Sequence, residues 1–193
     1  MTISRRSALG AVVAGAALTV LSALPAEAED AAVINSKMNL ALAKLWKEVP
    51  GSKQLSERAV GMLIMPDVIK GGLIVGGAYG QGGLRINTPG KGYGPTVAYY
   101  SVSAASVGLQ IGIQSTSHVL FFLTDKALKT FRDANGWQIG ADAEVTFPGA
   151  GANIGADSTS FKKPIVAIVF GADGLLVGAS LEGAKYNRIN PGG

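Results

Sequence analysis

The stretch closest to a binding motif is glycine-rich and runs from Lys70 to Gly83 (KGGLIVGGAYGQGG). Glycine-rich loops beside strands can hold phosphate groups on their backbone amides. A Walker A loop, however, ends in Gly-Lys-Ser/Thr, and the only Gly-Lys pair here, Gly90-Lys91, is followed by glycine. A dinucleotide-binding loop needs a third glycine where Arg85 stands and must open a helix. Both phosphate motifs are absent, so the glycines are predicted to let a strand bend and approach its neighbours closely.

Few residues are suited to catalysis. His118 is the only histidine and borders the apolar run VLFFL, which favours a residue at a strand end over a catalytic base. Asp142 and Glu144 are two apart on an expected strand, so their carboxylates would share a face and could do acid–base work, although a solvated face explains the same pattern. The chain has no cysteine, which removes thiol catalysis and thiolate metal sites. We therefore expect a protein that is not an enzyme and that holds no metal or cofactor.

Residues 1–28 have the pattern of an export signal. The arginine pair of SRRSALG precedes an apolar stretch from Ala8 to Leu24, and Ala26-Glu27-Ala28 fits the small-x-small site of a signal peptidase. The segment resembles a twin-arginine signal. The general secretory route and an uncleaved membrane anchor are the alternatives. We expect one domain, residues 29–193, in the periplasm or cell envelope of a bacterium.

The mature chain is mildly basic, with 15 Lys+Arg against 12 Asp+Glu and a net charge of +3. This balance is compatible with attraction to an anionic membrane surface. It is too weak to indicate nucleic acid as a partner. Because no disulfide can form, packing alone must hold the fold, and a chain of about 165 residues is long enough for that.

Helical periodicity dominates the start of the mature chain. Apolar residues recur at three- to four-residue spacing from Asp30 to Val49, which predicts an amphipathic helix. Ser52 is expected to cap a short second helix from Lys53 to Arg58 or Ala59. Later in the chain, Thr124 is expected to cap a third helix from Asp125 to Ala134.

Strands are expected between and after these helices. The apolar run at 59–65 predicts a buried strand stopped by Pro66-Asp67, residues 87–96 predict a turn, and residues 137–147 predict another strand. PIVAIVF and LLVGASL flank an Asp-Gly turn signal and predict a hairpin. Because strands do not alternate with crossover helices, we expect an α+β fold. In it, N-terminal helices pack on a strongly curved, mostly antiparallel sheet or barrel with one inserted helix.

Basic and aromatic residues supply the candidate binding sites. Trp46 stands between Lys44 and Lys47 on the first helix, a mixture found at membrane interfaces, although a helix docked on the sheet shows the same pattern. A basic patch near the C-terminus and the lysine at the start of the glycine run add to these. The candidates for contact with lipid are Lys44, Trp46, Lys47, Lys70, Lys162, Lys163, Lys185 and Arg188.

Three segments resemble the SYLF domain family: AVGMLIMPDVIKGGLIVGGAYGQGGL, ASVGLQIGIQSTSHVLFFL and ADGLLVGASLEGAKYNRI. They occur in the family's order, and the resemblance covers Val33 to Ile189. It implies a lipid-binding module, because eukaryotic SYLF proteins associate with phosphoinositide-containing membranes through an amphipathic N-terminal helix and basic residues. Some also bind actin, which the export leader makes irrelevant here.

The expected function is therefore a non-enzymatic lipid- or membrane-binding protein of the bacterial envelope. It would associate with anionic, phosphoinositide-like headgroups through a basic amphipathic surface. One alternative is a binding module for a protein partner or for an apolar small ligand held within the sheet, since a closed barrel can enclose a cavity. Another is an enzyme that uses Asp142 and Glu144.

Overall fold

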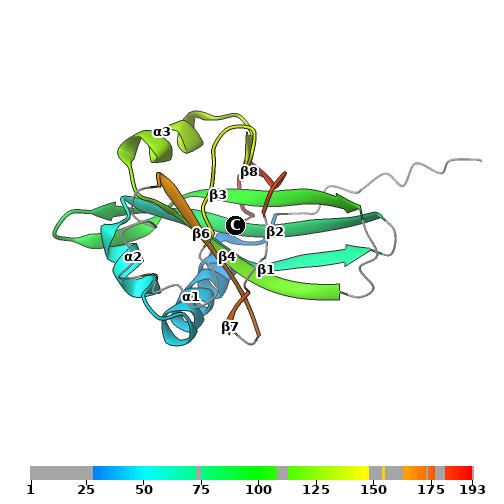
Figure 1. Ribbon diagram of the computed structural model, residues 1–193, viewed down its shortest axis with the longest axis horizontal. Helices are drawn as coiled ribbons and strands as arrows, with labels where there is room; N and C mark the ends of the chain where they lie inside the picture. Colours follow the sequence, from blue (N-terminus) through cyan, green and yellow to red (C-terminus); the bar gives the residue numbers. More distant parts are fainter. Residues whose placement is uncertain are drawn as a thin grey trace, which may run out of the picture.

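The computed structural model describes residues 28–72, 75–107, 113–147, 154, 163–172, 174–176 and 181–192. Its helices are α1 (Ala31–Glu48), α2 (Ser52–Arg58) and α3 (Asp125–Asp133). Its strands are β1 (Gly61–Gly72), β2 (Val75–Thr88), β3 (Gly92–Val107), β4 (Ile113–Phe122), β5 (Trp137–Gln138), β6 (Ile165–Gly171), β7 (Gly174–Leu175) and β8 (Lys185–Ile189). These strands form one sheet in the order β5-β8-β3-β2-β1-β4-β6-β7 (Figure 1).

This sheet is curved and open, and every neighbouring pair of its strands is antiparallel. The expected α+β class is confirmed. Closure into a barrel is wrong, because within the described residues the edge strands β5 and β7 are far apart in the strand order. Each edge strand has only two residues, so neither offers a ladder long enough to close the sheet.

Helices cover both faces of the sheet. Figure 1 shows α1 and α2 on one side and α3 on the other. Each side has its own apolar cluster, and β1 contributes to both by alternation: Met62 and Ile64 face α1, whereas Leu63 and Met65 face α3. A strand that is buried on both faces is apolar at every position, which explains the continuous run at 59–65.

The amphipathic stripe of α1 forms the core of its layer. The predicted helix is confirmed, and its buried residues are Ile34, Met38, Ala41, Leu42 and Leu45. Polar contacts at its flank fix its position on β2 and β3. The Asn35 side chain donates to the Tyr99 hydroxyl at 2.7 Å, and the Asn39 side chain accepts from Arg85 at 2.8 Å.

The strand β1 does not stop at Pro66-Asp67 as the sequence predicts. It continues to Gly72, with a register shift against β2 between Ile64 and Ile69. Asp67 has a φ of 47°, and its N–H donates to the Ser117 hydroxyl of β4 at 3.2 Å. The irregularity is a bulge, which accommodates a proline that has no N–H to give to the ladder.

The glycine run lies in β1 and β2 and serves close packing. A Cβ at Gly82 would stand 2.0 Å from the Ile64 carbonyl oxygen. A Cβ at Gly83 would stand 2.6 Å from the Thr96 methyl group and 3.1 Å from the Met38 sulfur. Only glycine lets α1 and the neighbouring strands approach β2 this closely, so the structural interpretation of these glycines is confirmed.

The predicted strand at 137–147 is largely wrong. Only Trp137–Gln138 pair as a strand, and a turn follows. The Asp142 carboxylate accepts from the Gln138 N–H at 2.6 Å, and the Asp142 N–H donates to the Gln138 carbonyl at 2.9 Å. Gly140, with a φ of 89°, supports the reversal. Local hydrogen bonds of this kind compete with a sheet ladder.

The helix caps follow prediction at one of two places. The Thr124 hydroxyl accepts from the Ala127 N–H at 3.2 Å, as expected for an N-cap. Ser52 is instead the first residue of α2, and its hydroxyl donates to the Leu45 carbonyl at 3.2 Å. It therefore ties the second helix to the end of the first. The predicted β6–β7 hairpin is confirmed.

Candidate functional site

The candidates on α1 point to different surfaces. Its apolar stripe is occupied by the sheet, so the docked helix cannot insert that stripe into a membrane. No helix in the described part of the chain is long and apolar enough to cross a bilayer. Lys44 and Trp46 lie on opposite sides of the helix, and each lines a different groove.

The groove lined by Trp46 has a volume of about 360 Å³, and we call it the hairpin groove. The indole is 42 % exposed. The Tyr93 hydroxyl donates to the Ser56 carbonyl at 2.8 Å and so holds the β2–β3 hairpin against α2. Burial raises the pKa of the Tyr93 phenol, which keeps it a neutral donor. The groove is lined by Trp46, Lys53, Ser56, Glu57, Asn87, Pro89, Gly90, Gly92 and Tyr93.

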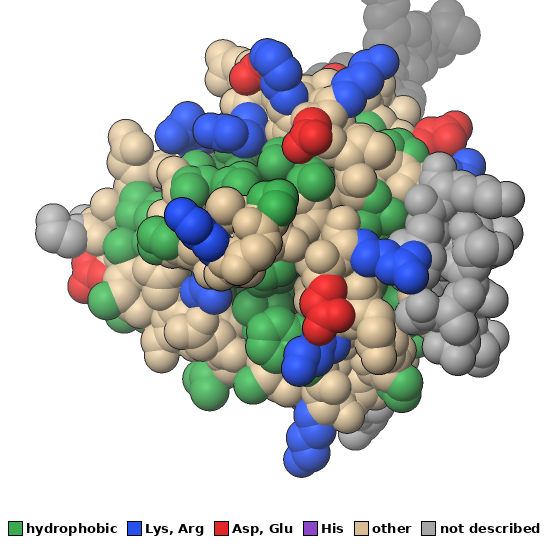
Figure 2. Space-filling view, turned by 90° about the vertical axis from the view of Figure 1, so that its left-hand side faces the viewer, with side chains coloured by type: hydrophobic (Ala, Val, Ile, Leu, Met, Phe, Trp, Pro, Cys, Tyr) green, Lys and Arg blue, Asp and Glu red, His purple; other side chains and the backbone are tan. Residues whose placement is uncertain are grey.

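The surroundings of the hairpin groove are basic. Lys53 lines the groove, as does the carboxylate Glu57. Lys91 lies between the lining residues Gly90 and Gly92, and Lys47 follows Trp46 on α1; all three lysines are exposed. The ion pairs among the described residues use other lysines, so these three charges are not neutralised by a bound carboxylate. Figure 2 looks onto this end of the molecule and shows apolar side chains interspersed with Lys and Arg and with a few Asp and Glu. The structure therefore combines an exposed indole, a groove and several cations in one place.

Lys44 lines a second groove, the α1–β4 groove, of about 330 Å³. Lys37 and Lys44 stand on one wall, and Asp67 and Ser115 stand opposite. Lys37 pairs with Glu29 at 2.7 Å, and Lys44 lies 4.0 Å from Glu48. Because carboxylates accompany both lysines, this groove is close to neutral.

An exposed apolar face adjoins the α1–β4 groove. Ile69 is 54 % exposed, and Ile113 is 82 % exposed. Ile69 pairs with Ser115 across β1 and β4, and paired residues project to the same side of a sheet. Sequence reasoning missed this face because the bulge at Pro66-Asp67 decides which residues beyond it point toward α1.

Lys70 and His118 occupy the opposite face of the sheet. His118 lies inside β4, not at a strand end, and is fully buried. Its Nε2 is 2.9 Å from the Tyr186 hydroxyl. Burial, and secondarily the charge of Lys70, lowers the pKa of His118 to about 3. The ring is therefore neutral and out of reach of a substrate at the surface.

This burial predicts loss of stability in mild acid. The folded-state pKa of His118 lies below the unfolded value of 6.5, so its contribution is complete above pH 6.5 and declines as pH falls toward 3. Between pH 7 and 5 we expect a loss of about 2 kcal/mol in the free energy of unfolding. Urea unfolding at both pH values measures it. The variant His118→Gln keeps a hydrogen-bond acceptor for Tyr186 and should show a smaller loss of unfolding free energy between pH 7 and 5. If the variant loses as much as the wild type, His118 is not the group responsible.

The C-terminal candidates are not gathered into one patch. Lys162 lies outside the described residues. Lys163 is exposed just before β6. Lys185 and Arg188 are both exposed on β8, but they are three residues apart and project to opposite faces. The structure thus separates residues that the sequence places side by side.

The carboxylate pair is also separated by the local fold. Asp142 belongs to the turn after β5, and its carboxylate is engaged by the Gln138 N–H. Asp142 and Glu144 line different grooves. The predicted common strand face is wrong because the turn replaces the strand. Among the described residues, no group of three or more histidine, aspartate or glutamate side chains could hold a metal ion.

The described residues form a single-sheet α+β domain with an exposed tryptophan and several lysines at or near the hairpin groove. Residues 103–190 match the Ysc84 family, described as Las17-binding protein actin regulator. This part of the chain is therefore similar to that family, in agreement with the SYLF resemblance. β1 and β2 precede the matched residues but lie between β3 and β4 in the sheet. A comparison with curated proteins found no match.

Proposed function

We propose that this protein binds anionic lipid at a membrane surface of the bacterial envelope and catalyses no reaction. The observation that carries the proposal is the exposed Trp46 in the hairpin groove, with Lys53 in the same lining and Lys47 and Lys91 next in sequence to lining residues. Indoles favour the headgroup region of a bilayer, and lysines near the surface attract lipid phosphates. The SYLF resemblance implies a lipid-binding module, which supports a lipid as the ligand.

The proposed contact is peripheral. The apolar stripe of α1 stays on the sheet, so binding needs no detachment of that helix. The hydrogen bond from Tyr93 to Ser56 holds the hairpin in place before lipid arrives, which reduces the ordering cost of binding. Each lysine near an anionic surface contributes about 1 kcal/mol. The three lysines together would then supply about 3 kcal/mol, with Trp46 adding apolar burial.

The envelope location rests on the leader. An exported protein meets the outer leaflet of the inner membrane and the periplasmic face of the outer membrane, where anionic headgroups are available. The family description names Las17 binding and actin regulation. We do not extend those partners to this chain, because the predicted export signal at residues 1–28 would remove it from the cytoplasm.

Vesicle flotation of the processed protein tests the proposal. The triple variant Lys47→Gln, Lys53→Gln and Lys91→Gln is expected to lower partitioning onto phosphatidylglycerol vesicles at low salt by roughly 100-fold. Trp46 emission should shift to the blue on binding, and this response should disappear in Trp46→Phe while buried Trp137 still emits.

A charge-matched control uses the candidates that lie elsewhere. The variant Lys70→Gln, Lys185→Gln and Arg188→Gln removes the same number of charges and is expected to change partitioning by less than about 5-fold. Equal losses in the two triple variants would mean that binding has no preferred surface. Absence of wild-type binding to anionic vesicles would reject the function itself.

A second candidate function is the binding of an apolar small ligand, favoured by a groove of about 430 Å³ between α3 and the turn after β5. Its walls are mostly apolar and include Ala127, Trp137 and Ile165. The groove is open to the surface, unlike the barrel interior that the sequence suggested. Native mass spectrometry of gently purified protein should show a bound ligand if this candidate holds, and a ligand-free mass would count against it.

A further inference from the structure

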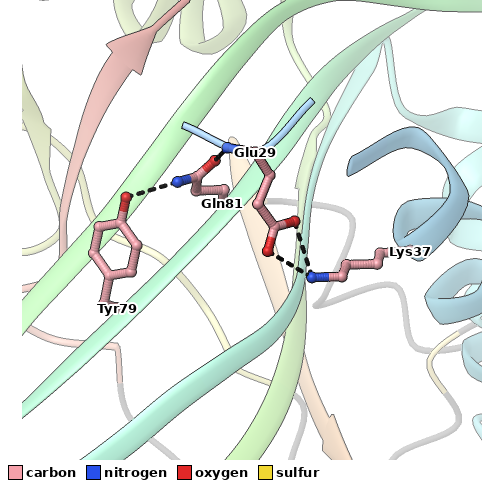
Figure 3. Close-up of polar contacts among 4 residues, drawn as sticks. All are labelled: Glu29, Lys37, Tyr79 and Gln81. Carbon is pink, nitrogen blue, oxygen red and sulfur yellow. Dashed lines mark hydrogen bonds and ion pairs between the residues drawn. The ribbon is translucent and has the colours of Figure 1, made fainter. Parts of the chain in front are cut away.

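Glu29 is the second residue of the described chain and is held by several hydrogen bonds. Figure 3 shows the Glu29 backbone nitrogen donating to the Gln81 side-chain oxygen of β2 at 2.9 Å. The two oxygens of the Glu29 carboxylate accept hydrogen bonds from the Lys37 ammonium of α1 at 2.7 and 2.9 Å. The other end of the Gln81 amide donates to the Tyr79 hydroxyl at 2.9 Å. Hydrogen bonds thus join four residues from three parts of the chain, Glu29, Lys37, Tyr79 and Gln81, and we call this set the clasp.

The neighbouring residues extend the clasp to the end of the chain. Asp30 forms a parallel bridge with Gly192, and the Ala31 N–H donates to the Gly192 carbonyl at 3.2 Å. Ala28 is half-buried and Glu29 is exposed. The peptide bond between them leads directly into Glu29, which the clasp holds.

The sequence marks this same bond. Ala26-Glu27-Ala28 fits the small-x-small pattern of a signal peptidase site, so cleavage would leave Glu29 as the first residue. Sequence pattern and structure are independent observations here. The pattern describes what a peptidase accepts, and the structure shows that the Glu29 nitrogen is held by Gln81.

We propose that the Ala28–Glu29 bond is a processing site and that the ammonium group it leaves on Glu29 docks on Gln81 to complete the clasp. A signal peptidase would hydrolyse the bond with water. The hydroxyl goes to the Ala28 carbonyl carbon, the peptide C–N bond breaks, and the Glu29 nitrogen takes up protons to become an ammonium. This proposal is independent of lipid binding.

Processing changes the chemistry of the donor. The amide of the precursor has one N–H and no charge, whereas the ammonium has three N–H groups and a positive charge. Hydrogen bonds from charged donors are roughly twice as strong as neutral ones. The nearby cation, Lys37, is already paired with the Glu29 carboxylate. The leader's removal therefore strengthens the attachment of α1 to β2.

The site of processing is tested first. The full chain is expressed in a bacterium with both export routes, and the envelope fraction is analysed by intact mass and N-terminal sequencing. The expected product begins at Glu29. A product that keeps the leader, or that begins at another residue, would overturn the assignment.

The clasp is tested by a double-mutant cycle on the processed protein. Adding Ala28 back to the N-terminus is expected to lower the melting temperature by about 2 °C, because the charge moves off the Gln81 oxygen. In Gln81→Leu the same addition should have no effect. In Gln54→Leu, on the exposed face of α2, the 2 °C loss should persist.

A second variant covers the case in which Gln81→Leu fails to fold. Gln81→Glu places a carboxylate opposite the ammonium, so the addition of Ala28 should cost more than in the wild type. A cost that is the same for Gln81, Gln81→Leu and Gln81→Glu, or no cost at all, would show that the ammonium does not dock there.

Discussion

Replacing Phe131 by alanine is expected to lower the free energy of unfolding by about 3–5 kcal/mol. The ring is at the centre of the aromatic cluster that binds α3 to the sheet. Its centroid lies 4.8 Å from that of Tyr100, 5.0 Å from Phe122, 5.3 Å from Trp137 and 6.3 Å from Tyr186. The alanine variant loses all four contacts and leaves a cavity among rigid rings.

Thermal unfolding measures this loss, with an expected drop in melting temperature of roughly 10 °C. Thr130→Ala is the matched control, because the neighbouring position in α3 is exposed and should change little. Buried Trp137 emission should shift to the red in Phe131→Ala. A drop of less than about 2 °C would mean that α3 contributes little to the stability of the domain.

Replacing Gly82 by alanine is the second large effect, with an expected loss of about 3 kcal/mol. The new Cβ would lie 2.0 Å from the Ile64 carbonyl oxygen and 2.8 Å from the Met65 sulfur. The sulfur can move aside, but the carbonyl belongs to the β1 backbone. β1 and β2 must therefore separate, and both apolar layers are strained because β1 contributes to each.

Gly94→Ala provides the control for this substitution. A Cβ at Gly94 would meet nothing within 4 Å, so that variant should be neutral or slightly more stable. Urea unfolding of the two variants separates a steric effect from a general cost of losing glycine. Equal stabilities would show that the sheet relaxes at Gly82 and that the close approach is not required.

Local signals in the sequence predicted much of the fold. The stripe in α1, the Thr124 cap and the Asp-Gly hairpin each depend on residues close together in the chain. The failures come from longer-range competition. Pro66 reads as a stop, yet β1 continues because β2 and β4 pair with it on both sides of the bulge. Residues 139–147 alternate like a strand, yet the side chain of Asp142 closes a turn instead.

The candidate site was predictable only in part. Trp46 and Lys47 were identified from their mixture on one helix. Lys91 and Tyr93 were assigned to a turn, but nothing in a linear sequence places that turn beside Trp46. That neighbourhood arises because α2 reverses the chain and Tyr93 bonds to Ser56. Lys185 and Arg188 show the opposite case, because they are close in sequence but project to opposite faces of β8.

The tapering of the sheet has a consequence for crowding. From β3 outward the strands shorten from 16 residues to 5 and then 2, and from β4 outward they shorten from 10 to 7 and then 2. Pro95 stands in the part of β3 that β8 does not cover, and it has no N–H to offer. Short, stepped borders interrupted by proline are poor templates for another strand. Copies of this protein that are concentrated on a membrane surface would therefore meet without pairing their sheets through the edge strands.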